Sequence, residues 1–252
     1  MDGVREYAVV VGASRGLGLA LCEELHRRGY EVSAVCRSSE NELASSSAIS
    51  FVGGCDITSV EGVDKMIRHV GARAVNILII NAGVLNPDTL ATFSASEAMH
   101  HFHVNSIAPV ILSQTLAPRL AQGARLGLIT GRMGSIQDTA QGGRPEGCYA
   151  YRMSKSALCM AGTLLHRDLQ GQGISVRLLD PGKVASDLSS RYGSRNPDGS
   201  PAQGWQSPDE AAQVVLNNLF RDTLDTSDLT AAAATTFPLV NIYGPEGLIR
   251  PW

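Results

Sequence analysis

Residues 9–18 read Val9-Val10-Val11-Gly12-Ala13-Ser14-Arg15-Gly16-Leu17-Gly18 and join an apolar, β-branched run to the start of a helical pattern. Glycines let the backbone turn tightly and approach a ligand closely, and the unpaired amides of a helix N-terminus favour negative charge. After a first strand, this G-x-x-x-G-x-G spacing predicts a turn that holds the pyrophosphate of a nucleotide. The residues expected there are Gly12, Ser14, Arg15, Gly16, Leu17 and Gly18.

Apolar runs alternate with helical patterns along the rest of the chain. The expected strands are residues 7–11, 31–36, 49–52, 76–80, 126–130, 175–179 and 237–241. The expected helices are residues 18–28, 59–70, 96–121, 150–170 and 208–220. Strands this apolar are typical of a parallel sheet that helices cover on both faces. We therefore expect one α/β domain over residues 1–252, a doubly wound Rossmann fold with a parallel sheet of about seven strands.

The charge, hydropathy and cysteine content of the chain exclude several classes of function. The chain of 252 residues carries 21 Lys and Arg against 24 Asp and Glu, and this net charge of -3 gives no electrostatic case for nucleic acid or an anionic membrane. No run approaches the roughly 18 apolar residues of a membrane span, and the N-terminus lacks the pattern of a signal peptide. The five cysteines are scattered without metal-ligand spacing, which indicates reduced thiols in a cytoplasmic protein.

A tyrosine and a lysine lie four residues apart at the start of the expected helix 150–170. This spacing puts Tyr151 and Lys155 on one helix face. A positive charge beside a phenol favours the phenolate and lowers its pKa, as a general acid and base requires. From these residues alone, an ordinary surface pair is an equal alternative.

Two long polar segments interrupt the alternation of strands and helices. Residues 137–148 are rich in glycine and directly precede the helix of Tyr151, while residues 188–206 are rich in Gly, Pro and Ser. Long irregular segments inside a compact domain are typical of lids and binding loops. We expect residues 188–206 to form a substrate lid.

Further short motifs follow the expected strands. They are Cys55-Asp56, Asn81-Ala82-Gly83, Asn105 in the long helix, and Asp180-Pro181-Gly182. Together with the glycine turn and the Tyr151/Lys155 pair, they make nearly the whole chain resemble the short-chain dehydrogenase/reductase family. The C-terminal residues 237–252 and the run 132–136 resemble the small carbonyl reductases of the C-factor or sniffer type.

The resemblance implies a role for each motif at a dinucleotide. Asp56 and Ile57 would lie against the adenine, and Asn81, Ala82 and Gly83 beside the adenosine ribose. Lys155 would hold the hydroxyls of the nicotinamide ribose, next to Tyr151. Residues expected to border the nicotinamide are Pro181, Gly182, Val184 and Ser186.

The end of the second expected strand predicts which dinucleotide binds. A carboxylate there, about 20 residues past the glycines, would bind the ribose 2′-hydroxyl of NAD. This chain has Cys36 followed by Arg37 instead. With no carboxylate to repel a 2′-phosphate, and with Arg15 and Arg37 available to bind it, NADP is preferred over NAD. The alternative is that both arginines only solvate the surface.

The catalytic residues that the resemblance implies are Tyr151, Lys155 and Asn105, with one departure from the family pattern. Tyr151 would exchange the substrate proton, and Asn105 would fix a water. The serine that orients the carbonyl would lie at position 131, which holds Gly131. Thr130 is one residue early and would point to the opposite face of a strand, and Ser135 follows the usual position. A substrate group, a residue of 137–148, or nothing would then fill the place of the serine.

Two other features invite a functional interpretation. Lys183, beside Gly182, would meet an acidic substrate or point into solvent. His100, His101 and His103 lie on mixed faces of a helix without an apparent carboxylate partner, so we expect no metal site.

These observations predict an NADP-dependent oxidoreductase that moves hydride between nicotinamide and a small carbonyl or alcohol, or an imine or amine, with Tyr151 as acid and base. Because a fold does not fix a chemistry, the alternatives are a non-redox cyclase, isomerase or lyase on this scaffold, and a non-catalytic nucleotide-binding regulator. The resemblance also implies a homodimer or homotetramer through the helices expected at 96–121 and 150–170.

Overall fold

The computed structural model describes residues 5–38, 49–142, 147–221, 242–246 and 249–250. Within them, one sheet has eight strands in the order β3-β2-β1-β4-β5-β6-β7-β8. The strands are β1 (Tyr7–Val11), β2 (Glu31–Val35), β3 (Ile49–Val52), β4 (Val75–Ile80), β5 (Leu120–Ile129), β6 (Ser175–Leu179), β7 (Ile242–Tyr243) and β8 (Ile249–Arg250). All pairings are parallel except the last, between β7 and β8, which is antiparallel.

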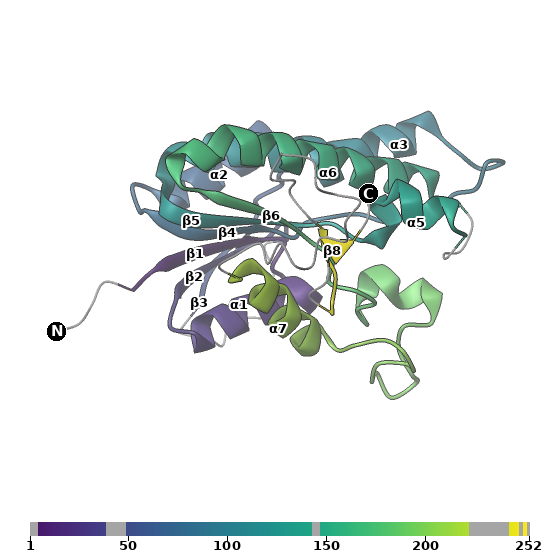
Figure 1. The fold of residues 1–252 in the computed structure, drawn as a ribbon. Helices are drawn as coiled ribbons and strands as arrows, with labels where there is room; N and C mark the ends of the chain where they lie inside the picture. Colours follow the sequence, from purple (N-terminus) through teal and green to yellow (C-terminus); the bar gives the residue numbers. More distant parts are fainter. Residues whose placement is uncertain (1–4, 39–48, 143–146, 222–241, 247–248, 251–252) are drawn as a thin grey trace.

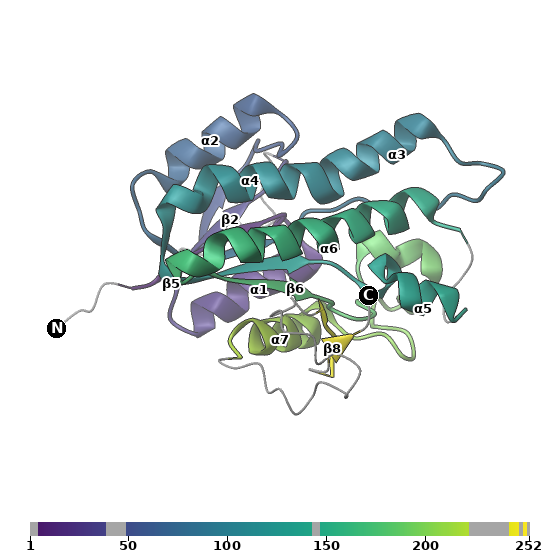
Figure 2. The ribbon, with the colours of Figure 1, turned by 45° about the horizontal axis from the view of Figure 1, so that its top comes forward.

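Helices cover both faces of this sheet (Figures 1 and 2). They are α1 (Gly16–Arg27), α2 (Val60–Val70), α3 (Ala95–Phe102), α4 (Ala108–Leu116), α5 (Ile136–Ala140), α6 (Tyr149–Leu169) and α7 (Pro208–Leu219). A π-helical turn, η1 (His103–Ile107), joins α3 to α4. Short 3₁₀ turns are η2 (Ala117–Arg119), η3 (Arg132–Gly134), η4 (Gln170–Gln172) and η5 (Asp187–Tyr192).

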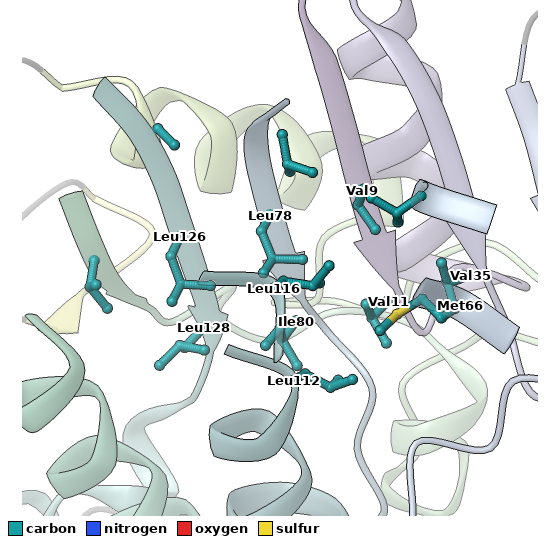
Figure 3. Close-up of a cluster of buried hydrophobic side chains, with 14 of the residues drawn as sticks. Val9, Val11, Val35, Met66, Leu78, Ile80, Leu112, Leu116, Leu126 and Leu128 are labelled. Carbon is teal, nitrogen blue, oxygen red and sulfur yellow. The ribbon is translucent and has the colours of Figure 1, made fainter. Parts of the chain in front are cut away.

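The alternation of side chains along β1 divides the core into two layers. Val9 and Val11 pack with side chains of α2, α4 and α6, whereas Ala8 and Val10 pack with side chains of α1 and α7. Figure 3 shows the first layer, in which Leu112 of α4 lies beneath the central strands. Because both faces are covered, the central strands are apolar throughout, which is why their positions could be predicted from the sequence.

Most predicted elements are confirmed to within a few residues, and strands 7–11, 49–52 and 175–179 match at both ends. The expected strand 237–241 lies outside the described residues, and β7 follows it. The helix expected over 96–121 corresponds to α3, η1, α4 and η2, and only its end is wrong. Pro118 removes a backbone donor and the chain extends into β5 from Leu120. The irregular segment expected at 137–148 contains α5, whose first amides Ser135 caps by accepting from Asp138 N.

The topology places the functional motifs together. In a doubly wound sheet, ligands bind beyond the carboxyl ends of the strands where the strand order reverses. Here that point lies between β1 and β4, which are neighbours although β2 and β3 intervene in sequence. The glycine turn after β1, residues 81–83 after β4, Gly131 after β5 and residues 180–182 after β6 therefore share one edge.

Candidate active site

The glycine turn between β1 and α1 leaves no room for side chains at two positions. Gly12 has φ of +84°, and a Cβ there would lie 2.5 Å from Ala82 N. A Cβ on Gly18 would lie 2.0 Å from Gly12 O. Asn81 Nδ2 donates to Gly12 O at 2.7 Å, which joins the ends of β1 and β4. The backbone at this turn is thus bare and fixed, as close approach to a phosphate requires.

The N-terminus of α1 is open to an anion. Arg15, at the N-cap position, makes no side-chain cap hydrogen bond, and the first turn of the helix carries no acidic residue. Orphan amides and the helix dipole favour negative charge at such an end. The turn therefore fits a dinucleotide pyrophosphate, as its sequence predicts.

The segment after β6 closes over this turn. A Cβ on Gly16 would lie 3.6 Å from Ser186 Cβ, so Ser186 borders the glycines. Gly182 has φ of +78°, and a Cβ there would meet Gln206 Nε2 at 2.5 Å. Gln206 Nε2 donates to Pro181 O at 2.8 Å, and Gln206 is bridged to Val184. The residues expected to border the nicotinamide therefore form one turn that hydrogen bonds to Gln206 hold in place, and this segment, residues 181–186, is called the pinned turn.

The two arginines expected at the 2′-phosphate have different surroundings. Arg37 is exposed at the end of β2. The pKa of Asp56 is lowered, mainly by hydrogen bonds from Thr58, while burial opposes this shift. The charge of Arg37 lowers the pKa of Asp56 further, which places Arg37 near that carboxylate. Thr58 N and Oγ1 donate to Asp56 Oδ1 at 2.8 and 2.7 Å. Arg15 instead pairs with Asp187 of η5, with Nε and Oδ2 3.1 Å apart. Arg37 makes no ion pair with the residues that the structure describes.

Tyr151 and Lys155 are both buried in the first two turns of α6. Lys155 Nζ donates to Ile129 O at 2.8 Å and lies 5.8 Å from the ring centroid of Tyr151. Burial lowers the pKa of Lys155 to about 8. Burial also raises the pKa of Tyr151, and the charge of Asp180 raises it further.

The direction of the Tyr151 shift corrects an expectation. The spacing to Lys155 predicts a lowered pKa for the phenol, but the pKa is raised in this structure. The physical reason is that complete burial penalises the phenolate and that the ammonium of Lys155 is directed to the carbonyl of Ile129. Tyr151 is therefore held in its protonated form.

Asn105 lies in the π-helical turn η1, a feature that often occurs at functional sites. Its Oδ1 accepts from Val84 N at 2.9 Å. Its Nδ2 donates to Val84 O at 3.0 Å and to Ser154 Oγ at 2.9 Å. A Cβ on Gly83 would lie 3.3 Å from Asn105 Oδ1 and 3.7 Å from Lys155 Nζ. Asn105 thus ties the end of β4 to the helix of the tyrosine.

Position 131 has room for a side chain. Gly131 has an extended backbone with φ of 166°, and the nearest atom to a Cβ there would be Asp180 Oδ1 at 3.9 Å. Thr130 Oγ1 lies 3.1 Å from Cys159 Sγ of α6. The Ser135 hydroxyl caps α5. The hydroxyls of Thr130 and Ser135 therefore both have structural partners.

Three residues at the start of α6 were not found from the sequence. Asp88 anchors the helix, because its carboxylate accepts from Tyr149 N and, at 3.1 Å, from Ala150 N, while Asp88 O accepts from Cys148 N at 2.8 Å. Cys148 has φ of 57°, the left-handed region. Its Sγ lies 3.3 Å from the hydroxyl of Tyr192 in η5. No local pattern marks these residues, because their contacts span between 44 and 62 positions of the chain.

A cavity of about 580 Å³ opens beside the pinned turn. Residues that line it are Arg132, Gly182, Lys183, Gly204, Trp205, Gln206, Glu210 and Pro245. Lys183 Nζ lies 6.0 Å from the centroid of the Trp205 ring, and Arg132 pairs with Asp138 at 2.6 Å. Lys183 thus borders a space continuous with the turn expected at the nicotinamide.

The histidine cluster has a structural role at its buried member. His101 Nε2 accepts from Asn86 N at 3.0 Å, and its Nδ1 lies 2.8 Å from Glu97 O. No group of three or more His, Cys, Asp or Glu side chains placed to hold a metal ion occurs in the described part of the chain. Among the same residues, no helix combines the length and apolarity needed to span a membrane.

Comparison with known proteins gives matches over most of the chain. The family model described as short chain dehydrogenase matches residues 6–197. The 1-hydroxy-2-glutathionyl-2-methyl-3-butene dehydrogenase of Rhodococcus sp. (strain AD45) is 31% identical over 221 residues, which are 87% of this chain and 92% of that protein. The C-signal protein of Myxococcus xanthus is 38% identical over 117 residues, 45% of this chain and 68% of that protein.

Solved structures share the fold. The NADPH-bound carbonyl reductase from chicken fatty liver superposes with a TM-score of 0.78 at 24% identity, covering 99% of this chain and 100% of that one. A carbonyl reductase from Pseudomonas aeruginosa PAO1 superposes with a TM-score of 0.75 at 23% identity, covering 98% and 100%. The single-domain, doubly wound fold expected from the sequence is confirmed.

Proposed function

Because this chain belongs to the short-chain dehydrogenase family and is an oxidoreductase of that type, we propose that it transfers hydride between NADP and a small carbonyl compound or its alcohol. An imine and its amine are chemically equivalent substrates for such a transfer. The observation that carries the proposal is the burial of Tyr151 and Lys155 together at the edge of the sheet where residues 81–83 end β4.

The residues of this edge fit a dinucleotide. The bare turn at Gly12 and Gly18 and the open N-terminus of α1 would hold its pyrophosphate, together with Ser14, Gly16 and Leu17. Asp56 and Ile57 would meet the adenine, and residues 81–83 the adenosine ribose. Lys155 would hold the other ribose, while the turn of Pro181, Gly182, Val184 and Ser186 would border the nicotinamide, whose chemistry is to give or take the hydride.

The residues at the end of β2 favour NADP over NAD as the cofactor. Cys36 is buried there and carries no charge that would repel a 2′-phosphate, and the exposed Arg37 next to it has no ion-pair partner among the described residues. Arg15 is 70% exposed in its pair with Asp187, so a phosphate competes with a single carboxylate for it. A guanidinium binds phosphate through two parallel hydrogen bonds.

Tyr151 is the general acid of the reduction. Its phenol donates a proton to the carbonyl oxygen as the hydride reaches the carbon, and it takes the proton back from the alcohol in the reverse reaction. Since burial raises the pKa of Tyr151, the phenol is protonated at neutral pH and ready to donate. Asn105 keeps the ends of β4 and α6 in register through Val84 and Ser154, which makes it a positioning residue.

The segment 188–206 closes the substrate side of the site as a lid. Its ends are held by the hydrogen bonds of Gln206 N to Lys183 O and Ala185 N to Gln206 O, both 2.9 Å. Between these ends, Arg195 and Pro201 form an isolated bridge. Trp205 and Lys183 line the neighbouring cavity, which would receive the part of the substrate remote from the carbonyl.

The protein assembles through α4 and α6. Ile107 and Ile111, one turn apart, are 49% and 39% exposed, and Met160 and Leu164 are 62% and 49% exposed. Contiguous apolar side chains on a surface are typical of an interface. Leu158, in contrast, is buried in the core of the subunit. A homodimer, or a homotetramer built from it, would cover this face.

NADPH consumption across a panel of aldehydes, ketones and cyclic imines tests the proposed function. We expect turnover by the wild type, and a loss of about a thousandfold in kcat for Tyr151→Phe with NADPH binding retained. If no substrate of the panel consumes NADPH, products formed with and without NADPH would identify a non-redox reaction. A Tyr151→Phe protein that matches the wild type in every assay would indicate a nucleotide-binding regulator.

A further inference from the structure

We propose that Tyr192 supplies the hydroxyl that Gly131 lacks, and that it polarises the substrate carbonyl by donating a hydrogen bond to its oxygen. This inference rests on the proposed function, since it concerns the second donor of the same reaction. One donor of this kind contributes on the order of a hundredfold to a thousandfold in rate. Its absence at position 131 therefore calls for a group elsewhere.

The position of Tyr192 is determined by contacts on both sides of η5. At the start of the turn, Ser186 N donates to Ser189 Oγ at 3.0 Å, and Ser189 Oγ donates to Val184 O at 2.6 Å. Asp187 pairs with both Arg15 and Arg195, each at 3.1 Å. The turn that carries Tyr192 is thus fixed to the segment that borders the glycine turn.

The phenol of Tyr192 points to the start of α6. Its hydroxyl lies 3.3 Å from Cys148 Sγ, and Cys148 directly precedes the helix, three residues before Tyr151. Tyr192 and Cys148 are both near enough to raise the pKa of Tyr151. The hydroxyl of Tyr192 therefore lies at the start of α6, within electrostatic reach of the Tyr151 phenol.

The hydroxyls of Thr130, Ser135 and Ser154 are all buried and have partners within the protein. Thr130 contacts Cys159 of α6, and Ser135 caps α5. Ser154 Oγ donates to Tyr151 O at 2.8 Å and accepts from Asn105 Nδ2. Tyr192, like Thr130, contacts a thiol, which is a weak hydrogen-bonding partner, but Thr130 is buried whereas Tyr192 is 36% exposed. Exchanging that contact for a carbonyl oxygen costs little.

Charge makes a neutral donor valuable at this site. The Asp180 carboxylate lies beside position 131 and within electrostatic reach of Tyr151, so it opposes negative charge on a substrate oxygen. Burial raises the pKa of Tyr192 to about 12, which keeps the hydroxyl protonated. Tyr192 only donates a hydrogen bond and keeps its proton, while Tyr151 transfers the proton that balances the hydride.

Four variants test the assignment: Tyr192→Phe, Gly131→Ser, the double variant, and Tyr149→Phe as the control. Tyr149 is an exposed tyrosine of the same helix start, with its ring edge against Phe93. We expect Tyr192→Phe to lower kcat about a hundredfold, with unchanged Tm and NADPH affinity, and Tyr149→Phe to match the wild type. Because position 131 has room, Gly131→Ser should fold normally and restore most of the lost kcat in the double variant.

The proposal is overturned if Tyr192→Phe keeps kcat within about twofold of the wild type. It is also overturned if the serine does not restore activity, since Tyr192 would then act only through the structure of the lid. Both results leave the proposed function intact as long as Tyr151→Phe is inactive. Activity that survives Tyr151→Phe would contradict the proposed function itself.

Discussion

Lys155 lies buried at the carboxyl edge of the sheet, where its ammonium donates to the carbonyl of Ile129 at 2.8 Å. Burial opposes the charge of the ammonium, and the folded protein therefore loses this proton at a lower pH than the unfolded chain. At the scale of single residues, the site thus combines an easily deprotonated lysine with a tyrosine that stays protonated. Both properties have measurable consequences.

We expect kcat/KM for NADPH to fall as the pH rises through about 8, the pKa of Lys155, because a neutral lysine no longer presents a cation to the ribose and the phenol. This ratio reports ionisations of the free enzyme. The unfolded chain holds more protons between about 8 and the ordinary value of 10.5, so the free energy of unfolding should rise with pH in that window. Lys65→Met, at an exposed position of α2, is the control and should keep both profiles. A profile flat through pH 8 in the wild type would contradict the prediction.

We expect Arg37 to determine the preference for NADPH over NADH. Arg37→Asp should raise the KM for NADPH by at least about tenfold, since a charge-assisted pair with a phosphate is lost and a repulsive carboxylate is gained. The KM for NADH should change little. Steady-state kinetics with both cofactors measure the difference, and Arg73→Asp, on the opposite end of the sheet beside Glu31, is a control for charge alone. An unchanged KM for NADPH in Arg37→Asp would show that Arg37 does not bind the 2′-phosphate.

At the scale of elements, the orientation of α6 depends on a residue far away in the chain. Asp88 takes the first amides of the helix and so determines where the turn carrying Tyr151 begins. Gly147 is required for the same contact, because a Cβ there would lie 2.3 Å from Asp88 O. The helix that carries Tyr151 is thus anchored from the loop after β4.

Asp88→Ala should lower the free energy of unfolding by about 1 kcal/mol through loss of the cap, and it should also lower kcat because Tyr151 loses its fixed position. Ser207→Ala is a matched control, since Ser207 caps α7 by accepting from Glu210 N at 3.2 Å and lies in no proposed catalytic contact. We expect a similar loss of stability for Ser207→Ala without a loss of kcat. Chemical denaturation and initial rates measure the two effects, and equal kcat in both variants would exclude a role for Asp88 in positioning.

At the scale of the whole molecule, the subunit exposes apolar side chains of α4 and α6 that face away from the buried core layer. Each of these helices buries its other side against the sheet, with Leu112 and Leu158 in the core. The exposed apolar surface is therefore formed by the sides of α4 and α6 that face away from the sheet. Association between copies would remove it from water.

Ile111→Glu combined with Met160→Glu should shift the protein from dimer to monomer, because charges would enter an apolar interface. Sedimentation at several protein concentrations measures the change. Val60→Glu, at the exposed start of α2, is the control for added charge and should keep the wild-type assembly. A wild-type protein that sediments as a monomer at all concentrations would contradict this interface.

Local patterns determined the elements and their order. The β-branched run of β1 is apolar because helices cover both of its faces, and Gly12 and Gly18 are glycines because no Cβ fits. Such requirements act within a few residues and can be predicted from the sequence. The predicted helix end at 121 was wrong because residues past Pro118 still have the composition of the helical residues 96–116. Pro118 nevertheless prevents the backbone from continuing the helix.

By itself, the sequence determined the doubly wound fold, the glycine turn and the alignment of Tyr151 with Lys155, since each depends on the period or chemistry of neighbouring residues. Only the tertiary structure decided the ionisation of Tyr151, because burial by the whole domain outweighs one charge four residues away. It also decided that Asp88 holds the start of α6 and that Tyr192 faces it across Cys148. These contacts join segments distant in the chain, and the distance between such segments is set by packing.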